Sequence, residues 1–120
     1  MIKVGIIGAG RIGKVHCESI MRYVKDATVK TVADPFLTEQ TVEWAKGLGI
    51  NEFTKDYRDV LNDKEIDAVL ICSSTDTHSK ISIEAIESGK HVFCEKPIDH
   101  DVGKILEVMK TVVVDRLFAE

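Results

Sequence analysis

The sequence predicts an α/β fold with a doubly wound parallel sheet, and three observations predict it. Short β-branched apolar runs alternate with longer segments of helical period along the 120 residues, which is typical of repeated βα units. The first apolar run, 2–7, leads into a glycine-rich turn, and the second, 28–33, ends at an acidic residue. Together these observations indicate a Rossmann-type sheet in a single domain, since a chain of this length has room for one core.

The first half of the chain predicts three strands and two helices. The run 2–7 is the first strand. A helix over 11–24 follows, because apolar side chains recur at helical spacing on one face: these are Ile12, Val15, Ile20, Met21 and Val24. The run 28–33 is the second strand. Thr38 can cap a helix that ends at Gly47 or Gly49, and a short third strand is expected at 52–54.

The second half continues the alternation. Asp56 can cap a short helix, and the apolar run 67–72 predicts a fourth strand buried on both faces. A helix over 77–88 and a strand over 91–94 follow. The last helix is expected to open near 99–101, with apolar side chains at Ile105, Leu106, Met109, Val112 and Val113. The β-branched residues 111–114 could instead form a sixth strand, but the apolar spacing continues to Leu117 and favours helix.

The charge and hydropathy of the chain exclude several classes of protein. The net charge is −4, from 16 basic and 20 acidic residues, and no basic run could neutralise nucleic acid or an anionic membrane. The apolar runs are far shorter than the roughly 20 residues that span a bilayer. The first strand begins within two residues, which leaves no space for a signal peptide. We therefore expect a cytoplasmic protein that binds neither nucleic acid nor membrane.

Cysteine and histidine usage predicts neither a disulfide nor a metal site. Cys17, Cys72 and Cys94 are odd in number, widely spaced and set among apolar neighbours, so small buried thiols are expected. The histidines do not share metal-ligand spacing with a second histidine or cysteine; they are His16, His78, His91 and His100.

The segment GAGRIG at 8–13 fits the pattern G-x-G-x-x-G. Alone the pattern is common, but here it follows a strand and opens a helix. In that context Gly8 permits the tight turn, Gly10 admits a pyrophosphate close to the backbone, and Gly13 lets helix and strand pack closely. The phosphates would sit on free N–H groups at the helix start, beside the side chains of Arg11 and Ile12. The alternative is a glycine turn with a structural role only.

Asp34 lies about twenty residues beyond Gly13, at the end of the second strand. A carboxylate there can accept hydrogen bonds from the adenosine ribose hydroxyls, and it would repel the 2′-phosphate of NADP. The next residues, 35–37, include no arginine or lysine, so NAD is the expected cofactor. Asp34 could also form the turn before Pro35, and the two roles are compatible.

Polar residues follow the fourth and fifth strands, whose carboxyl ends should border the ligand crevice. After the fourth strand, Ser73, Ser74, Thr75 and His78 could bond ribose or phosphate oxygens, although such residues are equally expected as helix caps. After the fifth strand come Glu95, Lys96 and Pro97. A lysine at that position can stabilise a developing alkoxide, whereas the alternative is a solvated Glu-Lys pair before a turn.

Four segments in this order resemble the Gfo/Idh/MocA oxidoreductases: GAGRIG at 8–13, ADPF at 33–36, the strand from 67 that leads to Thr77 and His78, and GKHVFCEKP at 89–97. Among these enzymes the chain is most similar to the inositol 2-dehydrogenases. The resemblance implies a Rossmann-like domain that binds NAD or NADP. It also implies that Glu95 and Lys96 lie beside the nicotinamide, that Lys96 contributes to catalysis, and that Pro97 shapes the turn.

The family's second domain supplies most of the polyol pocket and a catalytic Asp-x-x-x-His pair. No histidine of this chain follows an aspartate by four residues, and the tail 112–120 does not match the usual crossing segment. The chain thus resembles a fragment or an isolated domain, expected to bind cofactor with little or no turnover. Two rivals stay open: a nucleotide sensor without chemistry, and an S-adenosylmethionine-dependent methyltransferase. Apolar surface uncovered by the missing domain predicts a homodimer.

Overall fold

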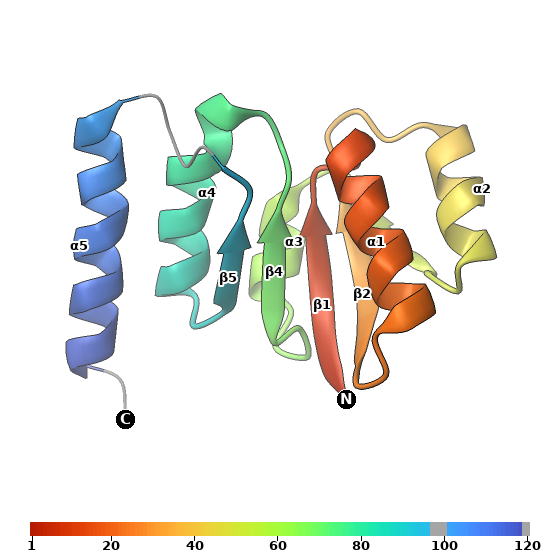
Figure 1. Cartoon of the computed structure of the whole chain (residues 1–120), viewed down its shortest axis with the longest axis horizontal. Helices are drawn as coiled ribbons and strands as arrows, with labels where there is room; N and C mark the ends of the chain where they lie inside the picture. Colours follow the sequence, from red (N-terminus) through yellow and green to blue (C-terminus); the bar gives the residue numbers. More distant parts are fainter. Residues whose placement is uncertain (97–100, 119–120) are drawn as a thin grey trace.

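Five parallel strands form one sheet in the order β3–β2–β1–β4–β5 in the computed structural model, which describes residues 1–96 and 101–118 and side chains through residue 112 (Figure 1). The strands are β1 (Ile2–Ile7), β2 (Ala27–Ala33), β3 (Glu52–Thr54), β4 (Ala68–Ile71) and β5 (His91–Cys94). The predicted positions of all five strands are confirmed to within one residue at each end.

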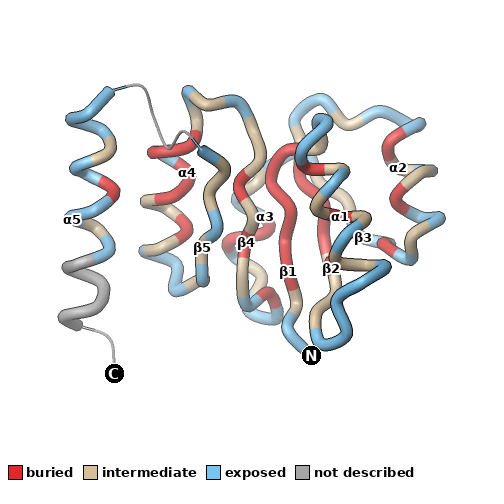
Figure 2. The backbone as a smooth tube through the Cα atoms, in the orientation of Figure 1, coloured by how far each residue is buried: buried red, intermediate tan, exposed pale blue. Residues whose placement is uncertain are grey.

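Helices cover both faces of the sheet, as a doubly wound fold requires (Figures 1 and 2). The helices are α1 (Arg11–Tyr23), α2 (Glu39–Gly47), α3 (Tyr57–Asn62), α4 (Thr75–Glu87) and α5 (Val102–Phe118). Under α1 and α2 the sheet buries one core, which includes Val4 and Ile6. Under α3 and α4 it buries another, which includes Val69 and Ile71. The central strands β1 and β4 therefore contribute to burial on both sides.

The strand order reverses between β1 and β4. From β1 the chain first builds outward through β2 to β3, and it then returns to add β4 and β5 on the other side of β1. Because all strands are parallel, their carboxyl ends meet at one edge, the upper edge in Figure 1. In open α/β sheets a ligand crevice lies at such a reversal, since the two flanking loops diverge to opposite faces.

Local hydrogen bonds explain where the helices begin and end. The Thr38 side chain accepts from the Thr41 N–H at 3.2 Å, and Asp56 accepts from the Arg58 N–H at 2.9 Å, so both predicted caps are confirmed. Gly49 and Gly89 take the positive φ values of 97° and 84° beyond α2 and α4. The helix α4 begins at Thr75, two residues before the predicted start.

The buried face of α1 differs from the predicted one. The buried residues are Gly13 and Cys17, whereas Ile12 and Val15 are about half exposed. A helix that lies on a sheet buries one narrow stripe at spacings of three and four, and Gly13 sets that stripe because it permits the closest approach. The exposed Ile12 thus lies beside the glycine turn instead of in the core.

The backbone of residues 111–114 is helical, so the helix prediction for this segment is confirmed and no sixth strand forms there. The helix α5 packs against α4 through the buried Val108. Of the predicted apolar face, Ile105 is partly buried, whereas Leu106 and Met109 are at least half exposed. This leaves an apolar strip on α5 among the residues that the structure describes.

A network of charges links β1 and β2 to the turn between α3 and β4. The Lys30 ammonium pairs with Asp63 and lies 3.5 Å from Glu65, and Lys3 lies 3.1 Å from the same Glu65 carboxylate. The hydrogen bond from Lys30 lowers the pKa of Asp63, and the hydrogen bond from Lys3 lowers the pKa of Glu65. Both carboxyl groups therefore favour the folded state when they are ionised.

This network predicts a loss of stability in acid. A carboxyl whose folded pKa is lowered contributes stability above its unfolded pKa, and the contribution disappears as the pH falls through the folded value. We expect the urea midpoint of the wild type to fall as the pH drops below about 4. Asp63→Asn should lower the midpoint at pH 7 and should show a smaller further decrease in acid.

The control is Glu87→Gln, which alters an exposed carboxylate on α4 outside the network. Its urea midpoints should follow those of the wild type across the same pH range. An Asp63→Asn midpoint equal to that of the wild type at pH 7 would show that the network does not stabilise the fold.

Candidate functional site

The loops that follow β1, β2, β4 and β5 converge at the carboxyl edge of the sheet. Almost every residue that the sequence indicated for a cofactor lies at this edge, from the glycine turn at 8–13 to Glu95 and Lys96, and four of them, Gly8, Asp34, Ser73 and Ser74, line one cleft. Pro97 lies outside the described residues. Each loop contributes a different kind of group to the site, from bare main-chain N–H groups to carboxylates and hydroxyls.

The glycine turn is closely packed at Gly8. This residue has φ of 102°, which L side chains rarely adopt, and a Cβ placed on it would lie 2.5 Å from the Ser73 nitrogen. A Cβ on Gly13 would lie 1.9 Å from the Gly8 carbonyl oxygen. The two glycines therefore let the turn, the loop after β4 and α1 approach one another, as the motif predicts.

Gly10 has a different environment. It is the N-cap of α1, and a Cβ built on it would meet no atom within 4 Å. No side chain caps the helix, and the first turn of α1 carries no acidic residue. The N–H groups at this helix start thus face an open space with the positive end of the helix dipole behind them, which suits an anion. Arg11 is exposed beside this space.

Asp34 joins the turn after β2 to the glycine turn. Its Oδ1 accepts from the Phe36 N–H and its Oδ2 accepts from the Ala9 N–H, both at 2.7 Å. The first bond forms the expected turn. The second, between residues 25 positions apart, was not predicted, because a contact between two loops leaves no local pattern in the sequence. Each oxygen keeps a further lone pair for a ribose hydroxyl.

A cleft of about 640 Å³ opens between the loops after β1, β2 and β4. Gly8, Asp34 and Ser73 line it, and its outer wall includes the exposed Phe36. The walls also include Lys55, Asp56, Tyr57 and Arg58, none of which the sequence indicated for this site. Lys55 comes from the turn before α3 and Arg58 from the first turn of that helix, where it lies 3.5 Å from Glu84. The wall of the cleft thus carries basic side chains, although residues 35–37 do not.

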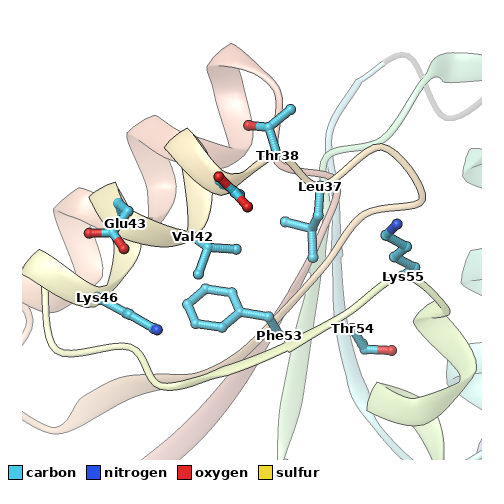
Figure 3. Close-up of a pocket in the computed structure, with 9 residues that line it drawn as sticks. Leu37, Thr38, Val42, Glu43, Lys46, Phe53, Thr54 and Lys55 are labelled. Carbon is cyan, nitrogen blue, oxygen red and sulfur yellow. The ribbon is translucent and has the colours of Figure 1, made fainter.

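A second hollow of about 620 Å³ lies between α2 and β3, away from the glycine turn (Figure 3). Leu37, Val42 and Phe53 point toward one another to form its apolar floor, and Lys46 lies at its rim (Figure 3). It has no glycine-rich turn. The helix start that borders it, that of α2, is already capped by the Thr38 side chain and carries the acidic Glu39, so it does not favour an anion. The cleft at Gly8 and Asp34 is therefore the better candidate for a dinucleotide.

The loop after β4 is held by hydrogen bonds among its own residues. The hydroxyl groups of Ser73 and Thr77 lie 2.7 Å apart, and Ser74 is the N-cap of α4 without a side-chain cap bond. His78 is only 2% exposed, and its Nε2 lies 2.8 Å from the Ser73 carbonyl oxygen. The His78 ring thus supports the loop from inside the protein, while Ser73 and Ser74 line the cleft.

At the end of β5 the Glu95 carboxylate turns toward α1. Its Oε2 lies 3.2 Å from His16 Nε2, whereas Lys96 is exposed. His16 was not among the residues predicted for the site. The only local signal was its place three residues after Gly13, on the helix that carries the glycine turn.

The thiols near the site have raised pKa values. Burial raises the pKa of Cys17 to about 12, and burial together with the charge of Glu95 raises the pKa of Cys72 to about 12. Burial also raises the pKa of Cys94. Cys72 and Cys94 are only partly buried, in contrast to the prediction, because both lie where a strand ends at the open edge of the sheet. Such thiols are protonated at neutral pH and serve as packing groups.

Two classes of site are not found among the residues that the structure describes. No group of three or more histidine, cysteine, aspartate or glutamate side chains is arranged to hold a metal ion. None of the described helices has the length and apolarity needed to cross a membrane.

Comparison with known proteins identifies the family of this chain. The model of the oxidoreductase family with an NAD-binding Rossmann fold, GFO_IDH_MocA, matches residues 2–115. The chain belongs to this family. The family resemblance inferred from the sequence is therefore confirmed, and the chain is an NAD-binding Rossmann domain.

The similar proteins include dehydrogenases of inositols. The chain is 38% identical to a myo-inositol 2-dehydrogenase of Thermotoga maritima over 112 residues, which are 91% of this chain and 33% of that protein. It is 41% identical to the uncharacterized oxidoreductase YrbE of Bacillus subtilis over 111 residues, 92% of this chain and 32% of that protein.

Among solved structures, scyllo-inositol dehydrogenase from Lactobacillus casei with bound NAD(H) and scyllo-inositol superimposes with a TM-score of 0.88 at 33% identity. The match covers 98% of this chain and 34% of that chain. The chain thus spans about a third of the length of the relatives that it matches.

Proposed function

We propose that this chain is the cofactor-holding domain of a dehydrogenase that moves a hydride from a secondary alcohol of a polyol, of the inositol kind, to NAD. The observation that carries the proposal is the open start of α1 at Gly10, next to Ala9, whose N–H donates to Asp34. Gly8 and Asp34 line one cleft beside it. The inositol dehydrogenases among the relatives support the choice of substrate class.

Different residues of the site would contact different parts of the dinucleotide. Gly8, Gly10 and Gly13 shape the turn whose main-chain N–H groups would hold the diphosphate, with Arg11 and Ile12 beside them. Asp34 would accept from the hydroxyls of the adenosine ribose. Ser73, Ser74 and Thr75 would bond sugar or phosphate oxygens, with His78 fixing their loop. Glu95, Lys96 and Pro97 would border the nicotinamide.

The bound nicotinamide supplies the hydride acceptor. Within this chain, Lys96 is the residue that we assign to catalysis. Its ammonium would lie near the reacting hydroxyl, where a positive charge stabilises the oxygen as its proton leaves. The proton itself needs an acceptor within hydrogen-bond reach, and a partly closed site that excludes water.

We infer that the chain alone binds NAD with little or no turnover. It has no Asp-x-x-x-His pair, and the polyol would meet its other contacts only in a second domain. A purified chain should give no polyol-dependent rise in NADH absorbance, and a robust rise would contradict this inference. A nucleotide sensor without chemistry is the second candidate, favoured by the cleft that Gly8, Asp34, Ser73 and Ser74 share in a chain without an Asp-x-x-x-His pair.

We further propose that residues 1–120 act as one dinucleotide-binding unit, with 111–120 as its tail, in a cytoplasmic protein that binds neither nucleic acid nor membrane. The exposed apolar strip of α5, with Leu106 and Met109, supports a homodimer that buries it. A monomeric mass by light scattering at high protein concentration would contradict the dimer.

Calorimetric titration with NAD, NADP and S-adenosylmethionine tests the proposal. We expect NAD to bind more tightly than NADP by about tenfold, because the 2′-phosphate would meet Asp34. S-adenosylmethionine should give no heat. Tighter binding of NADP would contradict the role proposed for Asp34, and binding of S-adenosylmethionine alone would contradict the dehydrogenase.

A further inference from the structure

A contact between His16 and Glu95 joins two parts of the candidate site that are 79 residues apart in the sequence. The Nε2 atom of His16 lies 3.2 Å from Oε2 of Glu95, and an ionised carboxylate accepts from an imidazole N–H at this distance. His16 comes from α1 and Glu95 from the end of β5, with β4 between β5 and the strand that precedes α1.

The contact is sheltered rather than a loose surface pair. The side chains of His16 and Glu95 are 29% and 27% exposed. The His16 ring also meets Phe93 edge to face, with ring centroids 5.7 Å apart. The Glu95 backbone is fixed as well, since its N–H donates to the Ile71 carbonyl at 3.0 Å. Both partners are thus held where they meet, so little side-chain entropy opposes the bond.

The helix that carries His16 is the helix whose start faces the open space at Gly10. His16 lies six residues after Gly10 on that rigid helix. The helix α1 therefore connects the expected position of the diphosphate, at its start, with the segment 95–96, which His16 contacts. We infer that His16 is a positioning residue, which holds Glu95 so that the segment 95–96 contacts the nicotinamide half of the dinucleotide.

This inference rests on the proposed function. Its test compares NAD with ADP-ribose, which has the same diphosphate and adenosine but no nicotinamide. Calorimetry on the whole chain should show that the wild type binds NAD more tightly than ADP-ribose. His16→Leu removes the donor and keeps an apolar side chain against Phe93. We expect this variant to lower the affinity for NAD by about tenfold, as for loss of a hydrogen bond to a charged group. Its affinity for ADP-ribose should stay within about twofold of the wild-type value.

His16→Gln should restore most of the NAD affinity, because its amide N–H can reach the same carboxylate. Glu95→Leu removes the acceptor of the same contact and should give the same selective loss of NAD affinity. The double variant should lose no more than either single variant, as expected for one shared contact. Glu18→Gln is the matched control, because Glu18 lies on α1 and pairs only with Arg22 among the described residues.

The outcomes separate the inference from the proposed function. If the wild type binds neither ligand, the proposed function fails and the inference fails with it. If the wild type binds both ligands equally, or if His16→Leu weakens both to the same extent, the proposed function stands and the inference is overturned. A melting temperature of His16→Leu near that of the wild type shows that the comparison is made on folded protein.

Discussion

Gly8→Ala is expected to destabilise the domain by about 4 kcal/mol, because two separate costs add at this position. The φ of 102° costs about 1–3 kcal/mol for a residue with a Cβ. The new Cβ would also lie 2.5 Å from the Ser73 nitrogen and 2.6 Å from the Cys72 carbonyl carbon. Those are backbone atoms that cannot rotate away, and such overpacking costs about 1–3 kcal/mol more. Urea unfolding followed by circular dichroism measures the loss.

Gly89→Ala is the matched control for Gly8→Ala. Gly89 has a similar φ of 84°, but a Cβ there would meet nothing within 4 Å. It should therefore show the conformational cost alone, roughly 1–2 kcal/mol. If the two variants are equally stable, the close approach between the glycine turn and the loop after β4 does not contribute to stability.

Gly10→Ala is expected to separate binding from stability. The backbone at Gly10 has φ of −77° and ψ of −164°, which alanine adopts without strain, and the Cβ would enter open space. Loss of an N-cap glycine costs at most about 1 kcal/mol of stability. The same Cβ would occupy the space in front of the α1 N–H groups, so we expect NAD affinity to fall about tenfold or more.

Gly47→Ala is the matched control for Gly10→Ala. Gly47 is the last residue of α2, and a Cβ there also meets nothing within 4 Å. Its calorimetric NAD affinity should equal that of the wild type. An unchanged affinity in Gly10→Ala would mean that the diphosphate does not approach this turn.

The sequence predicted the elements well because each one carries its own local signal. Thr38 and Asp56 mark helix starts, and the glycines at 8, 49 and 89 mark turns that need a positive φ. Where a local signal was ambiguous, packing against the sheet determined which residues are buried. On α1 the apolar residues Ile12 and Val15 fit a helical face equally well, but the sheet buries the stripe through Gly13 instead.

The sequence indicated many residues of the candidate site but not the contacts between them. The glycine turn and Asp34 could be found because both belong to one βαβ unit with known spacing. Three features of the site join segments that are far apart in the sequence: the bond from Ala9 to Asp34, the pair of His16 with Glu95, and the walls at Lys55 and Arg58. Such contacts depend on strand order, which a single sequence does not encode locally. His78 illustrates the same limit, since only the fold shows that its ring is buried.

The central claim is that main-chain N–H groups at the start of α1 hold the diphosphate of NAD. A nitrogen–proton correlation spectrum of the chain titrated with NAD tests it most directly. We predict the largest shifts at the amides of Gly10, Arg11 and Ile12, with no change at Phe53 in the hollow between α2 and β3. Unshifted amides at 10–12 at millimolar NAD, or shifts confined to that hollow, would contradict the claim.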